Sequence, residues 1–197
     1  MMEQKVNMDQ NLEKITFSQE EILRHIETLL EIGYVAFSEP EFKEDLNYSK
    51  KLFFDIRHDE ELAVEELKPM DQNNYLIWLM CDYVLKEQGK PFLAYLLESE
   101  EAEIIPVGLR KIADALVASR ISLYDVMSVD KEAKTLTLRE LFTLKGLRLE
   151  DSRLIELASS PVFFGLRIIK VNDVNYSVGD LYVYPEELKE NLSLIHI

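Results

Sequence analysis

The chain has little of the material from which most catalytic and metal-binding motifs are built. Its 197 residues include one cysteine, three histidines and six scattered glycines. The single thiol, Cys81, cannot form an internal disulfide, which is typical of a reducing compartment. The sequence has no P-loop, no Gly-x-Gly-x-x-Gly loop, no Gly-x-Ser-x-Gly turn and no His-Glu-x-x-His helix. These absences disfavour an enzyme, and we assign no catalytic residue and no cofactor.

Long hydrophobic runs are missing as well. No apolar stretch approaches the ~18 to 20 residues that a membrane-crossing helix needs. The first residues, MMEQKVNMDQNLEK, are polar and lack the apolar core of a signal peptide. We therefore expect a cytoplasmic protein without a membrane partner.

Positive charge is scarce in the first part of the chain. Residues 1–118 carry 25 acidic and 12 basic side chains, whereas residues 119–197 carry 12 and 10. An acidic surface repels the phosphate backbone of nucleic acids. Binding to nucleic acid is therefore disfavoured for the first part and stays open for the second.

Helical patterns dominate up to about residue 118. Ser18 with Glu21 forms a capping-box pattern, which predicts a helix that we expect Gly33 to end. Asp71 is expected to cap the most apolar helix, and Gly89 to end it.

After residue 118 the period of the apolar residues changes to two, with turn residues between short runs. Asn172 and Asp173 predict a tight hairpin. The chain is therefore predicted to be an α+β protein, with helices at 1–118 and a small antiparallel β meander or open barrel at 119–185. Residues 186–197 are expected to be a truncated helix start with a non-native tail.

Trp78 and Asp82 are the first candidate site residues, because they stand four residues apart on the most apolar predicted helix. The favoured interpretation is a core tryptophan with a polar neighbour. The functional alternative is that both side chains line a groove between the helices and the sheet.

Charged residues within the predicted strands form a second candidate site. Arg139, Glu140 and Arg167 interrupt apolar runs, and burying them unpaired would be costly. We expect them to pair with each other across strands, which is the favoured interpretation, or to mark the solvent face of the sheet. In the second case they would belong to a basic-aromatic face for an anionic or stacking ligand, together with Arg120, Tyr124, Tyr176 and Tyr182.

One segment superficially offers metal ligands. His58 lies within DIRHDEE, residues 55–61, which combines imidazole and carboxylates. The favoured interpretation is a fraying helix end followed by the acidic start of the next helix. We assign no metal site.

Several segments together resemble a known group of proteins. They are Ser122 to Val126, Leu138 to Leu141, Phe164 to Ile168 and Pro185 to Lys189, with Trp78 to Tyr83 upstream. This pattern, over about residues 74–192, resembles uncharacterised bacterial proteins often found with a SEC-C metal-binding motif. The resemblance implies no activity, and the cysteines of that motif are absent here.

The last residues also bear on that resemblance. The ending SLIHI, Ser193 to Ile197, resembles translated sequencing adaptor, so we expect the natural chain to be longer.

Three functional hypotheses follow. The leading one is a non-enzymatic binding or adaptor protein that holds a protein partner in the helix–sheet groove or on the Arg139/Arg167 face. The second is an accessory protein that touches nucleic acid through its β region. The third is an enzyme whose metal is held by His58 and nearby carboxylates.

Overall fold

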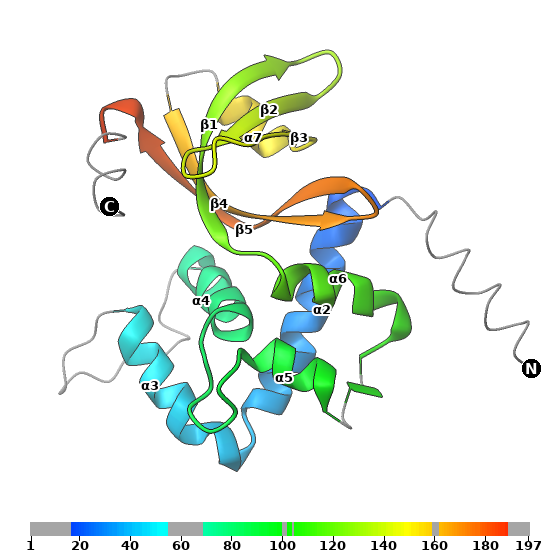
Figure 1. Cartoon of the computed structure of the whole chain (residues 1–197), viewed down its shortest axis with the longest axis vertical. Helices are drawn as coiled ribbons and strands as arrows, with labels where there is room; N and C mark the ends of the chain where they lie inside the picture. Colours follow the sequence, from blue (N-terminus) through cyan, green and yellow to red (C-terminus); the bar gives the residue numbers. More distant parts are fainter. Residues whose placement is uncertain (1–16, 55–68, 100–101, 104, 159–161, 189–197) are drawn as a thin grey trace, which may run out of the picture. The chain divides into compact units, whose positions relative to one another are not determined.

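The computed structural model describes residues 17–54, 69–99, 102–103, 105–158 and 162–188, and it divides into two compact units (Figure 1). The helical unit comprises Arg24–Arg120, and the sheet unit comprises Met1–Leu23 with Ile121–Ile197. Helices come first and a five-stranded antiparallel sheet follows, which confirms the α+β class. The predicted division at 118 and 185 stays a prediction.

The described part of the helical unit is built from helices. Its elements are most of α2 (Gln19–Phe37), η1 (Pro40–Phe42), α3 (Lys43–Phe53), α4 (Pro69–Cys81), α5 (Phe92–Glu98) and α6 (Val107–Val117). The rings of Phe37, Phe42 and Phe92 pack with centroid separations of 4.9 to 5.4 Å. This aromatic cluster joins α2, η1 and α5 into one core.

The start of α2 agrees with the capping-box prediction, but its end does not. The Ser18 amide donates to the Glu21 carboxylate at 2.8 Å, and the Glu21 amide donates to Ser18 Oγ at 3.2 Å. Gly33, however, does not end the helix, which continues to Phe37. A Cβ atom at position 33 would lie 2.8 Å from Sδ of Met80 in α4. Gly33 therefore serves the close approach of α2 and α4.

The end of α4 is a second correction. This helix stops at Cys81, well before the predicted end at Gly89. Residues 82–90 form a loop instead, in which Gly89 has a φ of +68° and Val84 forms a β-bridge with Pro91. The loop leaves the helix because the Tyr83 hydroxyl and the Lys86 amide both bind Asp45 of α3.

The sheet unit has the strand order β3-β2-β1-β4-β5. Its strands are β1 (Ile121–Asp130), β2 (Thr135–Glu140), β3 (Gly146–Leu149), β4 (Val162–Val171) and β5 (Val174–Pro185), and α7 (Ser152–Leu157) lies between β3 and β4. The first three strands form a meander, and β4 returns to pair with β1 on its other side. Leu154 of α7 packs with Tyr124, Leu136 and Phe164 in one core.

The hairpin between β4 and β5 confirms the Asn172–Asp173 turn. Both residues have positive φ angles, 49° and 66°, which the tight hairpin turn requires. The N-terminal residues of this unit also bind β5, which the sequence did not indicate. The Tyr176 hydroxyl donates to the backbone carbonyl of Phe17 at 2.8 Å, and the side-chain amide of Gln19 donates to the backbone carbonyl of Ser177 at 2.7 Å.

The predicted helix start at residues 186–197 lies at the end of the described chain. Glu186–Leu188 forms one turn of 3-10 helix, and residues 189–197 lie outside the described residues.

In the part of the chain that the structure describes, no helix combines the length and the apolar character required to cross a membrane.

Candidate functional site

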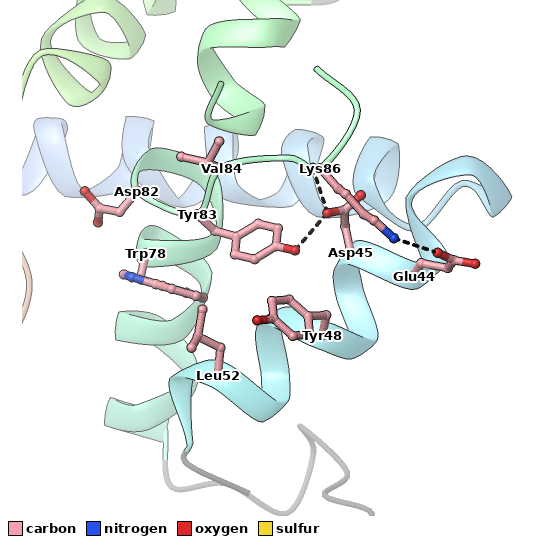
Figure 2. A pocket seen from close by; sticks show the side chains of 9 residues that line it. All are labelled: Glu44, Asp45, Tyr48, Leu52, Trp78, Asp82, Tyr83, Val84 and Lys86. Atoms are coloured by element: carbon pink, nitrogen blue, oxygen red, sulfur yellow. Dashed lines mark hydrogen bonds and ion pairs between the residues drawn. The ribbon is translucent and has the colours of Figure 1, made fainter. Parts of the chain in front are cut away.

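A pocket of about 700 Å³ lies in the helical unit, beside α3 and the end of α4 (Figure 2). All the described residues that line it belong to this one unit. They are Glu44, Asp45, Tyr48, Leu52, Trp78, Asp82, Tyr83, Val84 and Lys86.

The pocket is formed by one face of α3 and by the chain that leaves α4. Asp45, Tyr48 and Leu52 are spaced by three and four residues, so they share one face of α3. Trp78 stands on the last turn of α4, and Tyr83 follows in the loop. Figure 2 shows these two sets of side chains facing each other.

The Asp45 carboxylate is the most deeply buried acidic group of the pocket, with 7% of the residue exposed. Its Oδ1 atom accepts hydrogen bonds from the Tyr83 hydroxyl at 2.8 Å and from the Lys86 amide at 3.1 Å. Among the described residues, nothing donates to its Oδ2 atom, and no basic side chain forms an ion pair with Asp45. Buried carboxylates are normally paired with a cation. Asp45 is held in position without a counter-charge from any residue that the structure describes.

Tyr83 holds the carboxylate as a stable donor. Burial raises the pKa of the Tyr83 hydroxyl above its ordinary value, and the hydrogen bond to Asp45 raises this pKa further. The hydroxyl therefore keeps its proton throughout the neutral pH range and continues to donate to Asp45.

Aromatic rings form the wall beside Asp45. The Trp78 and Tyr83 ring centroids lie 5.5 Å apart, and Phe53 packs behind Trp78 at 5.2 Å. Trp78 is itself half-buried, so it both packs against its neighbours and faces the pocket.

Three further apolar side chains border the opening, and we call them the apolar rim: Tyr48, Leu52 and Val84. They are 61%, 55% and 55% exposed, although side chains of this kind are usually covered. The rim is therefore an apolar surface beside a charged interior.

The electrostatic character of the pocket is acidic. Among its described lining residues, three are acidic, Glu44, Asp45 and Asp82, and one is basic, Lys86. The Lys86 ammonium lies 3.8 Å from the Glu44 carboxylate, and both groups are highly exposed. The whole helical unit, Arg24–Arg120, carries 20 acidic and 11 basic side chains. A cationic group is the ligand that this field attracts.

Both helical site residues predicted from the sequence, Trp78 and Asp82, line this pocket. In Figure 2 the Asp82 side chain points away from the pair formed by Tyr83 and Asp45. The predicted groove between helices and sheet stays a prediction. Sequence reasoning missed Asp45 and Tyr83, because nothing local links residues 38 positions apart.

The predicted strand residues are distributed differently. Arg139 pairs across strands with Asp125, Nη2 to Oδ2 at 2.9 Å, as the register of β1 and β2 places them opposite each other. Glu140 accepts from the Ser122 hydroxyl at 2.7 Å and from the Thr143 hydroxyl. Arg139 is therefore paired across strands, but its partner is Asp125, which was not among the residues expected to pair with each other.

The solvent-face alternative is wrong for Arg167, which is 1% exposed in the middle of β4. Tyr124 and Tyr176 are also buried, at 6% and 3%. Arg120 is exposed and Tyr182 is half-buried. The predicted basic-aromatic face would need side chains that the fold has placed inside, since alternate residues of each strand point into a core.

The candidate metal ligands cannot be placed. Residues 55–61, with His58, lie outside the described residues. Among the described residues, no three His, Cys, Asp or Glu side chains are grouped closely enough to hold a metal ion.

Comparison with known proteins gives one match. The model of a family described as "Family of unknown function (DUF7986)" matches residues 55–194, a range that includes Trp78 to Lys86 but not α3. No curated protein and no solved structure matches the chain.

Proposed function

The chain belongs to the DUF7986 family of unknown function, and we propose from its geometry that it is a non-enzymatic protein that binds a partner protein. The partner would insert a cationic side chain into the pocket of the helical unit and lay apolar residues on the apolar rim. The observation that carries this proposal is Asp45, a buried carboxylate without a counter-charge in the described structure.

The lining chemistry supports binding of a cation. Aromatic faces attract cations, and a carboxylate beside them adds charge-assisted hydrogen bonding. The stem of a long basic side chain is apolar and suits the Trp78 and Tyr83 rings. None of the nine described lining residues is a serine, threonine, cysteine or histidine. The described lining therefore holds no Ser–His or Cys–His pair of the kind that activates a nucleophile.

A partner protein is favoured by the apolar rim. The exposed Tyr48, Leu52 and Val84 side chains could exclude water from the anchor point, as the contacts around an interface hot spot do. The net acidity of the helical unit complements a basic segment of a partner. The β face is a weaker candidate for nucleic acid, because Arg139 already pairs with Asp125 and Arg167 is buried.

The test is selection of random dodecapeptides on the full chain, followed by titration of the enriched peptides. Trp78 is the only tryptophan and lines the pocket, so its fluorescence reports binding there. We expect the enriched peptides to share a basic residue between apolar residues. The Asp45→Asn substitution should lower their affinity for the chain by about tenfold.

The matched control is Asp114→Asn, which removes one exposed negative charge from α6 of the same unit. It should leave affinity nearly unchanged, because Asp114 does not line the pocket. Equal weakening by both substitutions would show only general attraction to an acidic unit. Peptides without a shared basic residue would contradict the proposal.

Two finer expectations stay proposals from the sequence alone. These are association with a SEC-C type metal-binding module and a cytoplasmic location. Sequencing the native gene beyond codon 192 tests the first. A reading frame with clustered cysteines supports it, and a stop codon directly after Ile197 contradicts it.

A further inference from the structure

We propose that the cation bound by this pocket is the unmodified ammonium of a lysine, in preference to an arginine or a trimethylated lysine. This inference rests on the proposed function, because it specifies the side chain that the partner inserts. It follows from which acceptor positions of the Asp45 carboxylate are already used.

One oxygen of Asp45 is fully occupied. Oδ1 receives the Tyr83 hydroxyl at 2.8 Å and the Lys86 amide at 3.1 Å. A carboxylate offers about four acceptor positions, about two on each oxygen, so these two donors occupy both positions on Oδ1. Among the described residues no donor reaches Oδ2, which is therefore the oxygen left for a ligand.

A single oxygen suits an ammonium better than a guanidinium. The advantage of arginine over lysine comes from two parallel N–H···O bonds, one to each oxygen of a carboxylate. With Oδ1 filled, a guanidinium can form only one of these bonds. A lysine ammonium is a compact point charge whose three donors need no second oxygen in a fixed position.

The aromatic wall supplies the rest of the binding energy without changing this preference. Trp78 and Tyr83 can receive either cation over their ring faces, because the attraction is electrostatic and lacks strict hydrogen-bond geometry. Discrimination therefore falls on Oδ2 of Asp45.

Acetylation and trimethylation of the lysine should each weaken binding, for different reasons. Acetylation removes the positive charge. Trimethylation keeps the charge but removes every N–H donor, so the ligand would cover Oδ2 without donating a hydrogen bond to it. A purely aromatic cage would instead favour the trimethylated cation. The pocket thus discriminates a lysine by its modification state.

The experiment uses four peptides of one design, acetyl-Gly-Leu-X-Leu-Gly-amide. X is lysine, arginine, trimethyl-lysine or acetyl-lysine. Each is titrated into the full chain and followed by Trp78 fluorescence. We expect the lysine peptide to bind about tenfold more tightly than the arginine and trimethyl-lysine peptides, and the acetyl-lysine peptide to be weaker still.

The outcomes separate the two proposals. An arginine or trimethyl-lysine peptide that binds as tightly as the lysine peptide overturns the preference but leaves the cation-binding function standing. If none of the three cationic peptides binds, both proposals fail. Tyr83→Phe removes one donor from Oδ1 and should reduce the lysine preference severalfold, and an unchanged ratio would contradict the role given to Oδ1.

Discussion

Asp45 illustrates how one residue can take its role from partners far away in the chain. By itself it is an acidic residue in the first turn of α3, where a carboxylate is favourable beside the helix N-terminus. The loop after α4 then covers it and supplies two donors to the same oxygen. The result is an oriented carboxylate, with one oxygen assigned to the fold and the other directed to recognition.

The Tyr83 hydroxyl should therefore contribute to stability. We predict that Tyr83→Phe lowers the free energy of unfolding by about 1 to 2 kcal/mol, because a buried acceptor loses a donor. Urea unfolding followed by Trp78 fluorescence measures this change.

Tyr48→Phe is the matched control, since it removes the same hydroxyl from a tyrosine that is 61% exposed. Substitutions at such positions usually change stability by less than about 0.5 kcal/mol. If both variants lose the same stability, the Tyr83 to Asp45 hydrogen bond is not a stabilising contact.

Among the elements, the β4–β5 pair packs closely at a position where the residue, a glycine, has no side chain. Gly165 of β4 stands opposite Tyr182 of β5. A Cβ atom there would lie 3.1 Å from the Tyr184 ring and 3.2 Å from Cβ of Tyr182. These separations are shorter than normal carbon contacts, so the two strands could keep their present packing only with glycine.

We predict that Gly165→Ala destabilises the sheet unit by about 1 to 3 kcal/mol, the usual cost of overpacking. Gly108→Ala on α6 is the control, because nothing lies within 4 Å of the added carbon. It should be neutral or should stabilise by up to about 1 kcal/mol. Thermal unfolding by circular dichroism compares the two, and equal melting temperatures would contradict the prediction.

The whole molecule carries buried tyrosines in both units, which links its stability to alkaline pH. Burial raises the pKa of Tyr75 to about 12, although its hydrogen bond with the Ser49 hydroxyl opposes the shift. Burial also raises the pKa of Tyr83 in the helical unit and of Tyr176 in the sheet unit. All three phenols are therefore harder to ionise in the folded chain.

The sign of the pH effect follows from these shifts. Between the ordinary tyrosine pKa of about 10 and the raised values, the folded state binds more protons than the unfolded state. Stability is fully present below pH ~10 and falls as the pH rises towards about 12. The urea concentration at the midpoint of unfolding should decrease as the pH is raised from about 8 to about 11.5. The decrease should be less steep in the Tyr75→Phe variant. A constant midpoint would contradict this expectation.

The sequence by itself determined the α+β class, the capping box at Ser18 and the turn at Asn172 and Asp173. Each depends on residues a few positions apart, and local geometry selects among only a few backbone conformations. Helical spacing also drew attention to Trp78 and Asp82, which both line the pocket, and their role in binding stays a prediction.

Only the tertiary structure decided the end of α4 at Cys81, the passage of α2 beyond Gly33 and the burial of Arg167. It also brought Asp45 to Tyr83, which completes the pocket. These features depend on packing between segments distant in the sequence. Packing energy outweighs local preferences of about 1 kcal/mol per residue, so no local pattern could have shown them.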